Sequence, residues 1–257
     1  MPFPLPLPDV SWLSLTAILL IVLLAYTVFG ATGFGSSLIG VPLLAHLVPL
    51  TFAIPLITLL DSGAATSQSI RHWRHASWPV FRRLLPAMLV GIAIGTMALV
   101  TLPQAPLLLA LGIFVSGYGA YLLLGTRKLR RAPDWLAYPI GLVGGIFSVM
   151  FGTGGPVYMV FLSARIDDKS VLRATSSVVV TVSVWIRIIV FLVVGLLLNP
   201  PMLTMAALMV PVMILGLVIG NRVHDALSGA GFRRLLALLF LINGVLLIVR
   251  GVPVLVS

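Results

Sequence analysis

The chain has 257 residues, of which 60% are hydrophobic and 9% are charged, and its mean hydropathy is +1.18. This composition leaves too little polar surface for a soluble globular protein and predicts an all-α polytopic membrane protein. The formal charge of +10 does not indicate nucleic acid, because the basic residues fall in short groups between apolar spans. In that position they orient a membrane protein and contact anionic membrane lipids. The absence of cysteine excludes disulfides and thiolate metal sites.

The apolar segments follow one another in chain order between glycine, proline and charged breakers. The first, from Trp12, has neither a basic region before it nor an A-x-A cleavage site after it, so we expect a retained span rather than a signal peptide. A full crossing takes about 20 residues, so the seventh of the ten segments is too short to cross untilted. The ten segments are 12–29, 34–50, 52–70, 84–101, 107–124, 136–151, 154–165, 170–198, 203–220 and 235–250.

Most of the Lys and Arg residues form four groups that an even number of spans separates. The turns between them, TLPQAP (101–106) and LNPPML (198–203), carry no charge. Because basic loops stay on the cytoplasmic side, we expect a bacterial inner (plasma) membrane protein with all four groups inside and both termini outside. The groups are Arg71, Arg74, Arg82 and Arg83; Arg127, Lys128, Arg130 and Arg131; Arg165, Lys169 and Arg173; and Arg222, Arg233 and Arg234.

The second half of the chain repeats motifs of the first half. PAMLVGIAIG (86–95) matches PVMILGLVIG (211–220), LALGIFVSG (109–117) matches LALLFLING (236–244), and GFGSS (33–37) matches GTGGP (152–156). Five segments in each half would turn the second half upside down relative to the first. We therefore predict two inverted transmembrane repeats, residues 1–131 and 132–257; the alternative is chance similarity among apolar helices.

Glycine gathers in two breaks, which we name the first tip (residues 30–37) and the second tip (residues 152–156). In inverted repeats, broken or re-entrant helices meet near the midplane, and their free N-terminal amides bind anions. We expect caps at Ser36 or Ser37 and at Thr153, with Pro156 near the first helical position. Close helix packing is the alternative use of glycine, and we assign it to GIAIG (91–95) and GLVIG (216–220). The glycines expected to adopt positive φ are Gly30, Gly33, Gly35, Gly152, Gly154 and Gly155.

This arrangement resembles the sulfite exporter TauE/SafE family, also called the 4-toluenesulfonate uptake permease family. The resemblance rests on the two glycine-rich breaks, GATGFGSSLIGVP and GGIFSVMFGTGGP, each opening one half of the chain. The segment VLRATSSVVV (171–180) is similar to the family's Arg, Thr and Ser at the start of a helix, whereas the first tip lacks a further glycine that members often carry. The resemblance implies secondary transport of sulfite, a sulfonate or a related organic anion such as sulfoacetate.

Two charged residues lie well inside apolar spans, Asp61 and Arg187. Charges at that depth are costly and usually pair or face a polar cavity. We expect Asp61 to carry a coupling proton and Arg187 to attract the anion or hold Asp61 ionised. The alternatives are a fixed structural ion pair, or an arginine that extends to the outer interface.

The sequence therefore predicts a secondary transporter for a small sulfur-containing or organic anion, working by alternating access, with protons as a candidate coupling ion. The alternatives are an uncoupled small-anion channel and a membrane assembly subunit without transport activity. No catalytic, metal or cofactor motif indicates an enzyme. The oligomeric state, a homo-oligomer included, stays open. The predicted substrate-binding residues are Gly33, Gly35, Ser36, Ser37, Gly152, Thr153, Gly154, Gly155, Thr175, Ser176 and Arg187, and the predicted coupling residue is Asp61.

Overall fold

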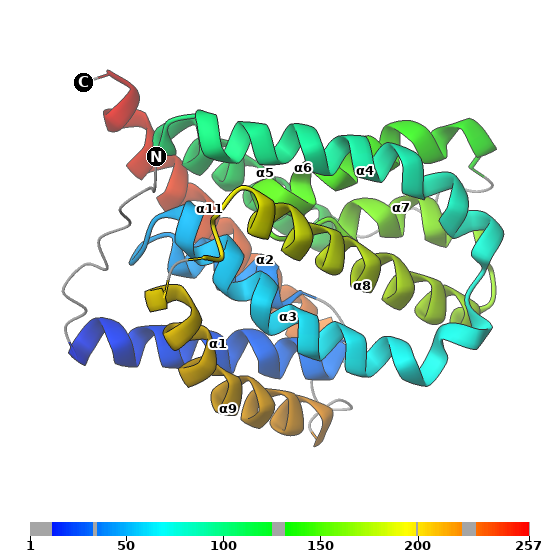
Figure 1. The fold of residues 1–257 in the computed structure, drawn as a ribbon, viewed down its shortest axis with the longest axis horizontal. Helices are drawn as coiled ribbons and strands as arrows, with labels where there is room; N and C mark the ends of the chain where they lie inside the picture. The colour runs from blue at the N-terminus through cyan, green and yellow to red at the C-terminus, as the bar shows by residue number, and fades with distance from the viewer. Residues whose placement is uncertain (1–11, 33–34, 125–131, 199, 223–229, 257) are drawn as a thin grey trace. The chain divides into compact units, whose positions relative to one another are not determined.

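A computed structural model describes residues 12–32, 35–124, 132–198, 200–222 and 230–256, and every long element in these ranges is an α-helix (Figure 1). Short 3-10 turns, η1 (Trp73–His75) and η2 (Asp134–Leu136), precede α4 and α6. The helices are α1 (Trp12–Thr32), α2 (Ser36–Leu44), α3 (Leu50–His72), α4 (Trp78–Thr101), α5 (Gln104–Leu124), α6 (Ala137–Met150), α7 (Gly155–Arg165), α8 (Lys169–Val193), α9 (Pro200–Arg222) and α11 (Ala230–Val256).

Within these ranges, seven helices are long and apolar enough to cross a membrane: α1, α3, α4, α5, α8, α9 and α11. The chain is therefore a multi-pass, all-helical membrane protein, as predicted. Helix α7 has 11 residues, too few for an untilted crossing, as expected for the seventh segment. The prediction for the second segment, 34–50, was wrong in length, because α2 ends at Leu44 after nine residues.

The chain forms two compact units, and each unit combines segments from both halves of the sequence. Unit 1 consists of Met1–Ile57, Thr101–Thr126 and Gly195–Ser257, and unit 2 consists of Thr58–Val100 and Arg127–Val194. Residue 131 is thus no boundary between compact units. The boundary at residue 131 between the two predicted sequence repeats is a separate matter and stays a prediction.

In unit 1, α1 packs along α9 and α5 packs along α11, although each pair joins distant parts of the sequence (Figure 1). The α1–α9 contact is close because glycines face it. A Cβ on Gly30 would lie 2.6 Å from the Leu217 carbonyl oxygen, and one on Gly216 would lie 2.9 Å from the Leu23 carbonyl oxygen. A Cβ on Gly220 would overlap the Thr27 carbonyl oxygen. GLVIG is therefore a helix-packing motif, as predicted.

In unit 2, α4 and α6 approach each other through glycines in the same way. A Cβ on Gly91 would overlap the Leu142 carbonyl oxygen, and one on Gly95 would lie 2.8 Å from the Ile146 carbonyl oxygen. From the other side, a Cβ on Gly145 would overlap the Met88 carbonyl oxygen. GIAIG thus packs α4 on the first helix of the second half, whereas GLVIG packs α9 on the first helix of the first half.

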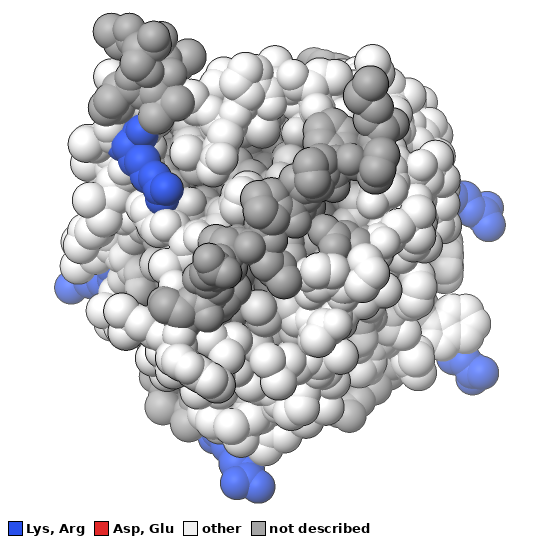
Figure 2. All heavy atoms as spheres, turned by 60° about the vertical axis from the view of Figure 1, so that its left-hand side comes forward, with Lys and Arg blue, Asp and Glu red and all other residues white. Residues whose placement is uncertain are grey.

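The described surface carries few charged side chains. On the face drawn in Figure 2 most atoms belong to uncharged residues, and the blue Lys and Arg atoms are few. Many large apolar side chains are exposed on the long helices, among them Leu20 (66%), Met97 (68%) and Ile242 (62%). Surfaces of this composition suit lipid contact.

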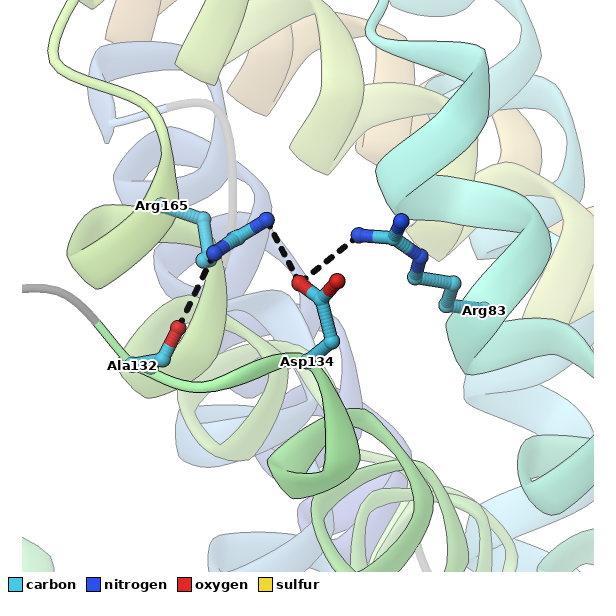
Figure 3. Close-up of polar contacts among 4 residues, drawn as sticks. All are labelled: Arg83, Ala132, Asp134 and Arg165. Carbon is cyan, nitrogen blue, oxygen red and sulfur yellow. Dashed lines mark hydrogen bonds and ion pairs between the residues drawn. The ribbon is translucent and has the colours of Figure 1, made fainter.

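Asp134 ties three elements of unit 2 together (Figure 3). Its Oδ1 lies 2.7 Å from Arg83 Nη1 on α4 and 2.6 Å from Arg165 Nη2 at the end of α7. Arg165 also donates to the Ala132 carbonyl oxygen at 3.2 Å. These side chains are partly exposed, so the network fixes the geometry of the link before α6 more than it adds stability.

Candidate functional site

The second tip is a buried break between two helices of unit 2. Helix α6 ends at Met150, Gly152 adopts a left-handed φ of 71°, and the Phe147 carbonyl oxygen accepts from the amides of both Phe151 and Thr153. Non-helical backbone at membrane depth has to be buried in protein or line a cavity. The second tip meets that requirement by burial, since residues 151–154 are all buried.

The cap and φ predictions for the second tip were partly wrong. Gly154, not Thr153, is the N-cap of α7, and its φ of −87° is ordinary, so of the tip glycines only Gly152 needs positive φ. Gly155 is the first helical residue. The prediction of Pro156 near the first helical position is confirmed, since Pro156 lies in the first two positions of α7. Proline suits this place because the amide that it lacks has no partner inside the helix.

Gly154 is explained by packing around Tyr158, one turn into α7. A Cβ on Gly154 would lie 2.6 Å from the Gly144 carbonyl oxygen and 2.7 Å from Tyr158 Cε2, and a Cβ on Gly144 would overlap the other edge of the same ring. The two glycines therefore leave a slot for the phenol ring between α6 and the tip. Tyr158 is only 1% exposed in that slot.

Polar groups converge beside the second tip, where the ring of Tyr158 ends. Arg187 on α8 is 2% exposed, and its Nη1 donates to the Ser148 carbonyl oxygen at 2.6 Å, in the last turn of α6. The Ser148 and Ser183 hydroxyls, both buried, are hydrogen-bonded at 3.0 Å. The Tyr158 hydroxyl lies close to these two hydroxyls and to Arg187, yet it has no hydrogen bond of normal geometry within the described part of the chain. We name Ser148, Tyr158, Ser183 and Arg187 the polar cluster.

Sequence reasoning found Arg187 but missed the other three members of the polar cluster. Ser148 and Ser183 are isolated hydroxyls in apolar helices, where most serines bond to their own preceding turn. A clue to Tyr158 did exist, because it stands four residues after the N-cap glycine, on the first turn of a helix already suspected of lining the site.

Helices α3 and α8 are antiparallel neighbours, and their register relates Asp61 to Arg187. Thr175 accepts from the Ser77 amide beyond the end of α3, whereas Thr181, later in α8, donates to the Ala65 carbonyl oxygen at 3.1 Å. From that contact Arg187 lies six residues, about 9 Å, along α8, and Asp61 lies four residues, about 6 Å, in the same direction along α3. The two residues are therefore at nearly the same level.

Asp61 is buried at 5% exposure on the same face of α3 as Ala65, one turn away. That face meets α8, because Ala65 and Thr66 both bond to it, Thr66 through Trp185 Nε1 at 3.0 Å. An aspartate on this face is consistent with the predicted role near Arg187. A direct contact between the two charges stays a prediction.

The first tip belongs to unit 1 and is described only in part, since Gly33 lies outside the described residues. Gly35 is the N-cap of α2, with a left-handed φ of 100° and open space where a Cβ would stand. The cap predictions for Ser36 and Ser37 were therefore wrong: both are buried in the first turn of α2. The φ prediction for Gly30 was wrong too, because this residue is inside α1 and packs against α9.

Thr175 and Ser176, the other hydroxyls predicted on α8, bond to backbone groups. Thr175 is fully buried and donates to the Val171 carbonyl oxygen besides accepting from the Ser77 amide. Ser176 donates to the Arg173 carbonyl oxygen at 3.0 Å. Thr175 lies eight residues, about 12 Å, along α8 from Ser183, so α8 does not bring it to the polar cluster.

The link between α7 and α8 is short and built by Asp168. This residue is the N-cap of α8; its carboxylate accepts from the Ser170 hydroxyl at 2.6 Å, and from the amides of Ser170 and Val171. The hydrogen bond from the Ser170 hydroxyl and the backbone bonds from Val171 and Ser170 lower the pKa of the Asp168 carboxyl. The cap explains why α8 begins directly after α7 ends.

Comparison with known proteins supplies the family. The family model for the sulfite exporter TauE/SafE matches residues 18–247, nearly the whole chain. The chain belongs to the TauE/SafE family. The resemblance seen in the two glycine-rich breaks is thereby confirmed, and the family is one of membrane transporters.

Two relatives are similar to this TauE/SafE family member over most of their length. One is the "Probable inner membrane transporter protein TsaS" of Comamonas testosteroni, 28% identical over 190 residues, or 74% of this chain and 80% of the relative. The other is the "Probable sulfite/organosulfonate exporter TauE" of Cupriavidus necator, 29% identical over 214 residues, or 79% of this chain and 81% of the relative. No solved structure matches the chain.

Proposed function

We propose that this TauE/SafE family member is a secondary transporter that moves a sulfite-type or organosulfonate-type anion across the bacterial inner membrane by alternating access. The observation that carries the proposal is Arg187, a cation buried inside a span and bonded to the end of α6 beside the second tip. A buried cation in a membrane span marks an ion or substrate path by default. The names of the relatives support a sulfur oxyanion as the substrate.

The proposed anion site consists of Arg187, the rest of the polar cluster and the start of α7. The first turn of a helix offers unpaired amides and a partial positive charge, which favour an anion in a low-dielectric setting. We assign the first tip the same anion-binding role, because its motif GFGSS (33–37) matches GTGGP (152–156) of the second tip.

Asp61 is the proposed proton carrier. Its burial on the face of α3 that meets α8, at nearly the level of Arg187, supports coupling between the protonation of Asp61 and anion binding. An anion at Arg187 and a proton on Asp61 would each neutralise one of the two buried mid-span charges, which favours binding both in the same step. Anion and proton would then move together.

Flux measurements in vesicles separate this proposal from its two rivals. Purified protein in liposomes is offered radiolabelled sulfite and methanesulfonate, with and without a pH gradient. A coupled transporter gives saturable flux that follows the gradient, a channel gives flux that neither saturates nor couples, and an assembly subunit gives no flux. Either of the last two results would refute the proposed mechanism.

We also propose that the four basic groups are cytoplasmic and that both termini lie outside. The long helices support this orientation, because α4 with α5 and α8 with α9 form pairs of spans between basic links. The uncharged links TLPQAP (101–106) and LNPPML (198–203) would then fall on the opposite side.

A further inference from the structure

The fold holds the phenol ring of Tyr158 in a fixed, buried position, but its hydroxyl makes no hydrogen bond of normal geometry within the described residues. Its ring is fixed by the slot between Gly144 and Gly154, and the residue is 1% exposed. Leaving a buried hydroxyl without a partner costs free energy, so a residue kept in this state calls for a reason.

The surroundings of the Tyr158 hydroxyl suit an anion rather than a further protein group. Its neighbours are the Ser148 and Ser183 hydroxyls and the Arg187 guanidinium. In the 3.0 Å bond between the two serines one hydroxyl donates to the other, which uses only one of their two protons. The polar cluster therefore combines one positive charge with several neutral donors from three different helices.

We propose that Tyr158 is a specificity-determining residue of the anion site, whose hydroxyl donates to a third oxygen of a tetrahedral oxyanion head. The inference rests on the proposed function and refines it to a substrate geometry. A sulfonate head presents three oxygens, which can accept from the guanidinium, the phenol and a serine hydroxyl at once. A carboxylate presents two oxygens in a plane and leaves one of these donors without a partner.

Discrimination of this kind is strong, because a buried donor without a partner is penalised. Sites built to bond a particular polar atom reject analogues that lack it far better than apolar pockets reject a missing methylene group. The polar cluster should therefore bind methanesulfonate more tightly than acetate, although the two anions carry the same charge and the same methyl group. Tyr158 should account for a large part of that difference.

The test uses the variant Tyr158→Phe of the full-length protein in detergent, with Tyr138→Phe as the matched control. Tyr138 lies on α6 but is 56% exposed, away from the polar cluster. Three quantities are measured for each protein: the Tm without anion, the Kd for methanesulfonate and the Kd for acetate, with both Kd values taken from the rise of Tm with anion concentration. Ser183→Ala serves as a second variant within the cluster.

We expect Tyr158→Phe to keep or raise the Tm of the anion-free protein, because it removes a buried group that has no partner. Its Kd for methanesulfonate should rise roughly 10- to 100-fold, the effect of one lost hydrogen bond to a charged ligand. Its Kd for acetate should change little, so the preference of the site for methanesulfonate over acetate becomes smaller. Ser183→Ala should also weaken methanesulfonate binding but lower the anion-free Tm, because it breaks the bond to Ser148. Tyr138→Phe should leave all three quantities unchanged.

Three results would overturn the inference. One is a lower anion-free Tm in Tyr158→Phe, which would show that the phenol already has a partner in the resting protein. The second is an unchanged Kd for methanesulfonate, and the third is an equal loss for both anions. If the wild-type protein binds neither anion and gives no flux in vesicles, the proposed function itself fails. If the wild-type protein binds and transports methanesulfonate and Tyr158→Phe gives one of the three results above, only the role of Tyr158 fails.

Discussion

At the second tip, neighbouring glycines perform different tasks. Gly152 ends α6 in the left-handed conformation, Gly154 makes room for the Tyr158 ring, and the Cβ position of Gly155 has only Val180 Cγ2 nearby, at 3.9 Å. The first two positions are thus constrained for separate physical reasons, positive φ at one and lack of space at the other. Gly155 is the position of the three where a small side chain fits.

This difference predicts unequal effects of two similar substitutions. Gly154→Ala should destabilise the protein by about 1–3 kcal/mol, because its methyl group overlaps a backbone oxygen and the Tyr158 ring. Gly155→Ala should change stability by less than about 0.5 kcal/mol. Thermal unfolding of both variants in detergent measures the difference. Equal Tm values for the two variants would show that the Tyr158 slot is not rigid.

The two mid-span charges give a second prediction at the residue scale. If Asp61 and Arg187 share one environment, either single change, Asp61→Asn or Arg187→Gln, leaves the other charge buried and should cost about 3–5 kcal/mol. The double change should recover most of that stability and still show no proton-coupled flux. Thermal stability and vesicle transport of the three variants decide the matter. Wild-type coupling in Asp61→Asn would remove Asp61 from the mechanism, and additive losses in the double variant would place the two charges in separate environments.

Sequence reasoning located both tips and both charges, but it could not rank the glycines or find Tyr158. Glycines that allow positive φ and glycines that only save space look the same in a sequence. The partners that distinguish them, Leu217 against Gly30 and Tyr158 against Gly154, lie on other helices or a turn away. Charged residues inside membrane spans are rare and are easily found in a sequence. A tyrosine in an apolar helix is common, so the sequence does not mark Tyr158 as a site residue.

At the scale of the elements, hydropathy predicted where long helices lie and failed where a break stays apolar. The segment 34–50 has no charged residue, so its hydropathy does not show that α2 stops at Leu44 and a turn follows before α3. Loops buried in a membrane protein keep apolar side chains and lose the usual polar signal. The same reasoning explains why α8 was expected to reach residue 198 but ends at Val193.

The cap at the start of α8 gives a prediction with a pH dependence. The pKa of Asp168 is lower in the folded protein than its ordinary value of about 4. Its contribution to stability is therefore present above that ordinary value and is lost as the pH falls through the lowered folded value. Asp168→Ala should lower the Tm at pH 7, and the gap to wild type should shrink towards pH 3. Asp168→Asn, an equally good N-cap, is the control and should stay close to wild type at pH 7. A gap that persists unchanged at low pH would contradict the capping role.

At the scale of the whole molecule, sequence alone could not predict that each compact unit draws on both halves. The contacts of α1 with α9 and of α4 with α6 join helices about 190 and about 50 residues apart in the sequence. The motifs GIAIG and GLVIG nevertheless make corresponding contacts, because Gly91 and Gly95 pack on the first helix of the other half, as Gly216 and Gly220 do. This correspondence of contacts is what a repeated design would produce.

The orientation of the chain can be tested with single cysteines, because the natural sequence has none. Cysteines in the four basic links, such as Arg74→Cys and Lys128→Cys, should react with a membrane-impermeant reagent only from the cytoplasmic side. Cysteines in the uncharged turns, such as Leu102→Cys, should react only from outside. Labelling of Lys128→Cys from outside alone would reverse the proposed topology.

Flux of radiolabelled methanesulfonate into liposomes that contain the wild-type protein or Arg187→Gln tests the central claim most directly. Insertion of both proteins is verified by their amounts in the vesicles and by a folded thermal transition. The account predicts saturable flux that a pH gradient drives in the wild type, and flux reduced at least 100-fold in Arg187→Gln, because the cation that attracts the anion is gone. Wild-type flux in a folded Arg187→Gln protein would contradict it.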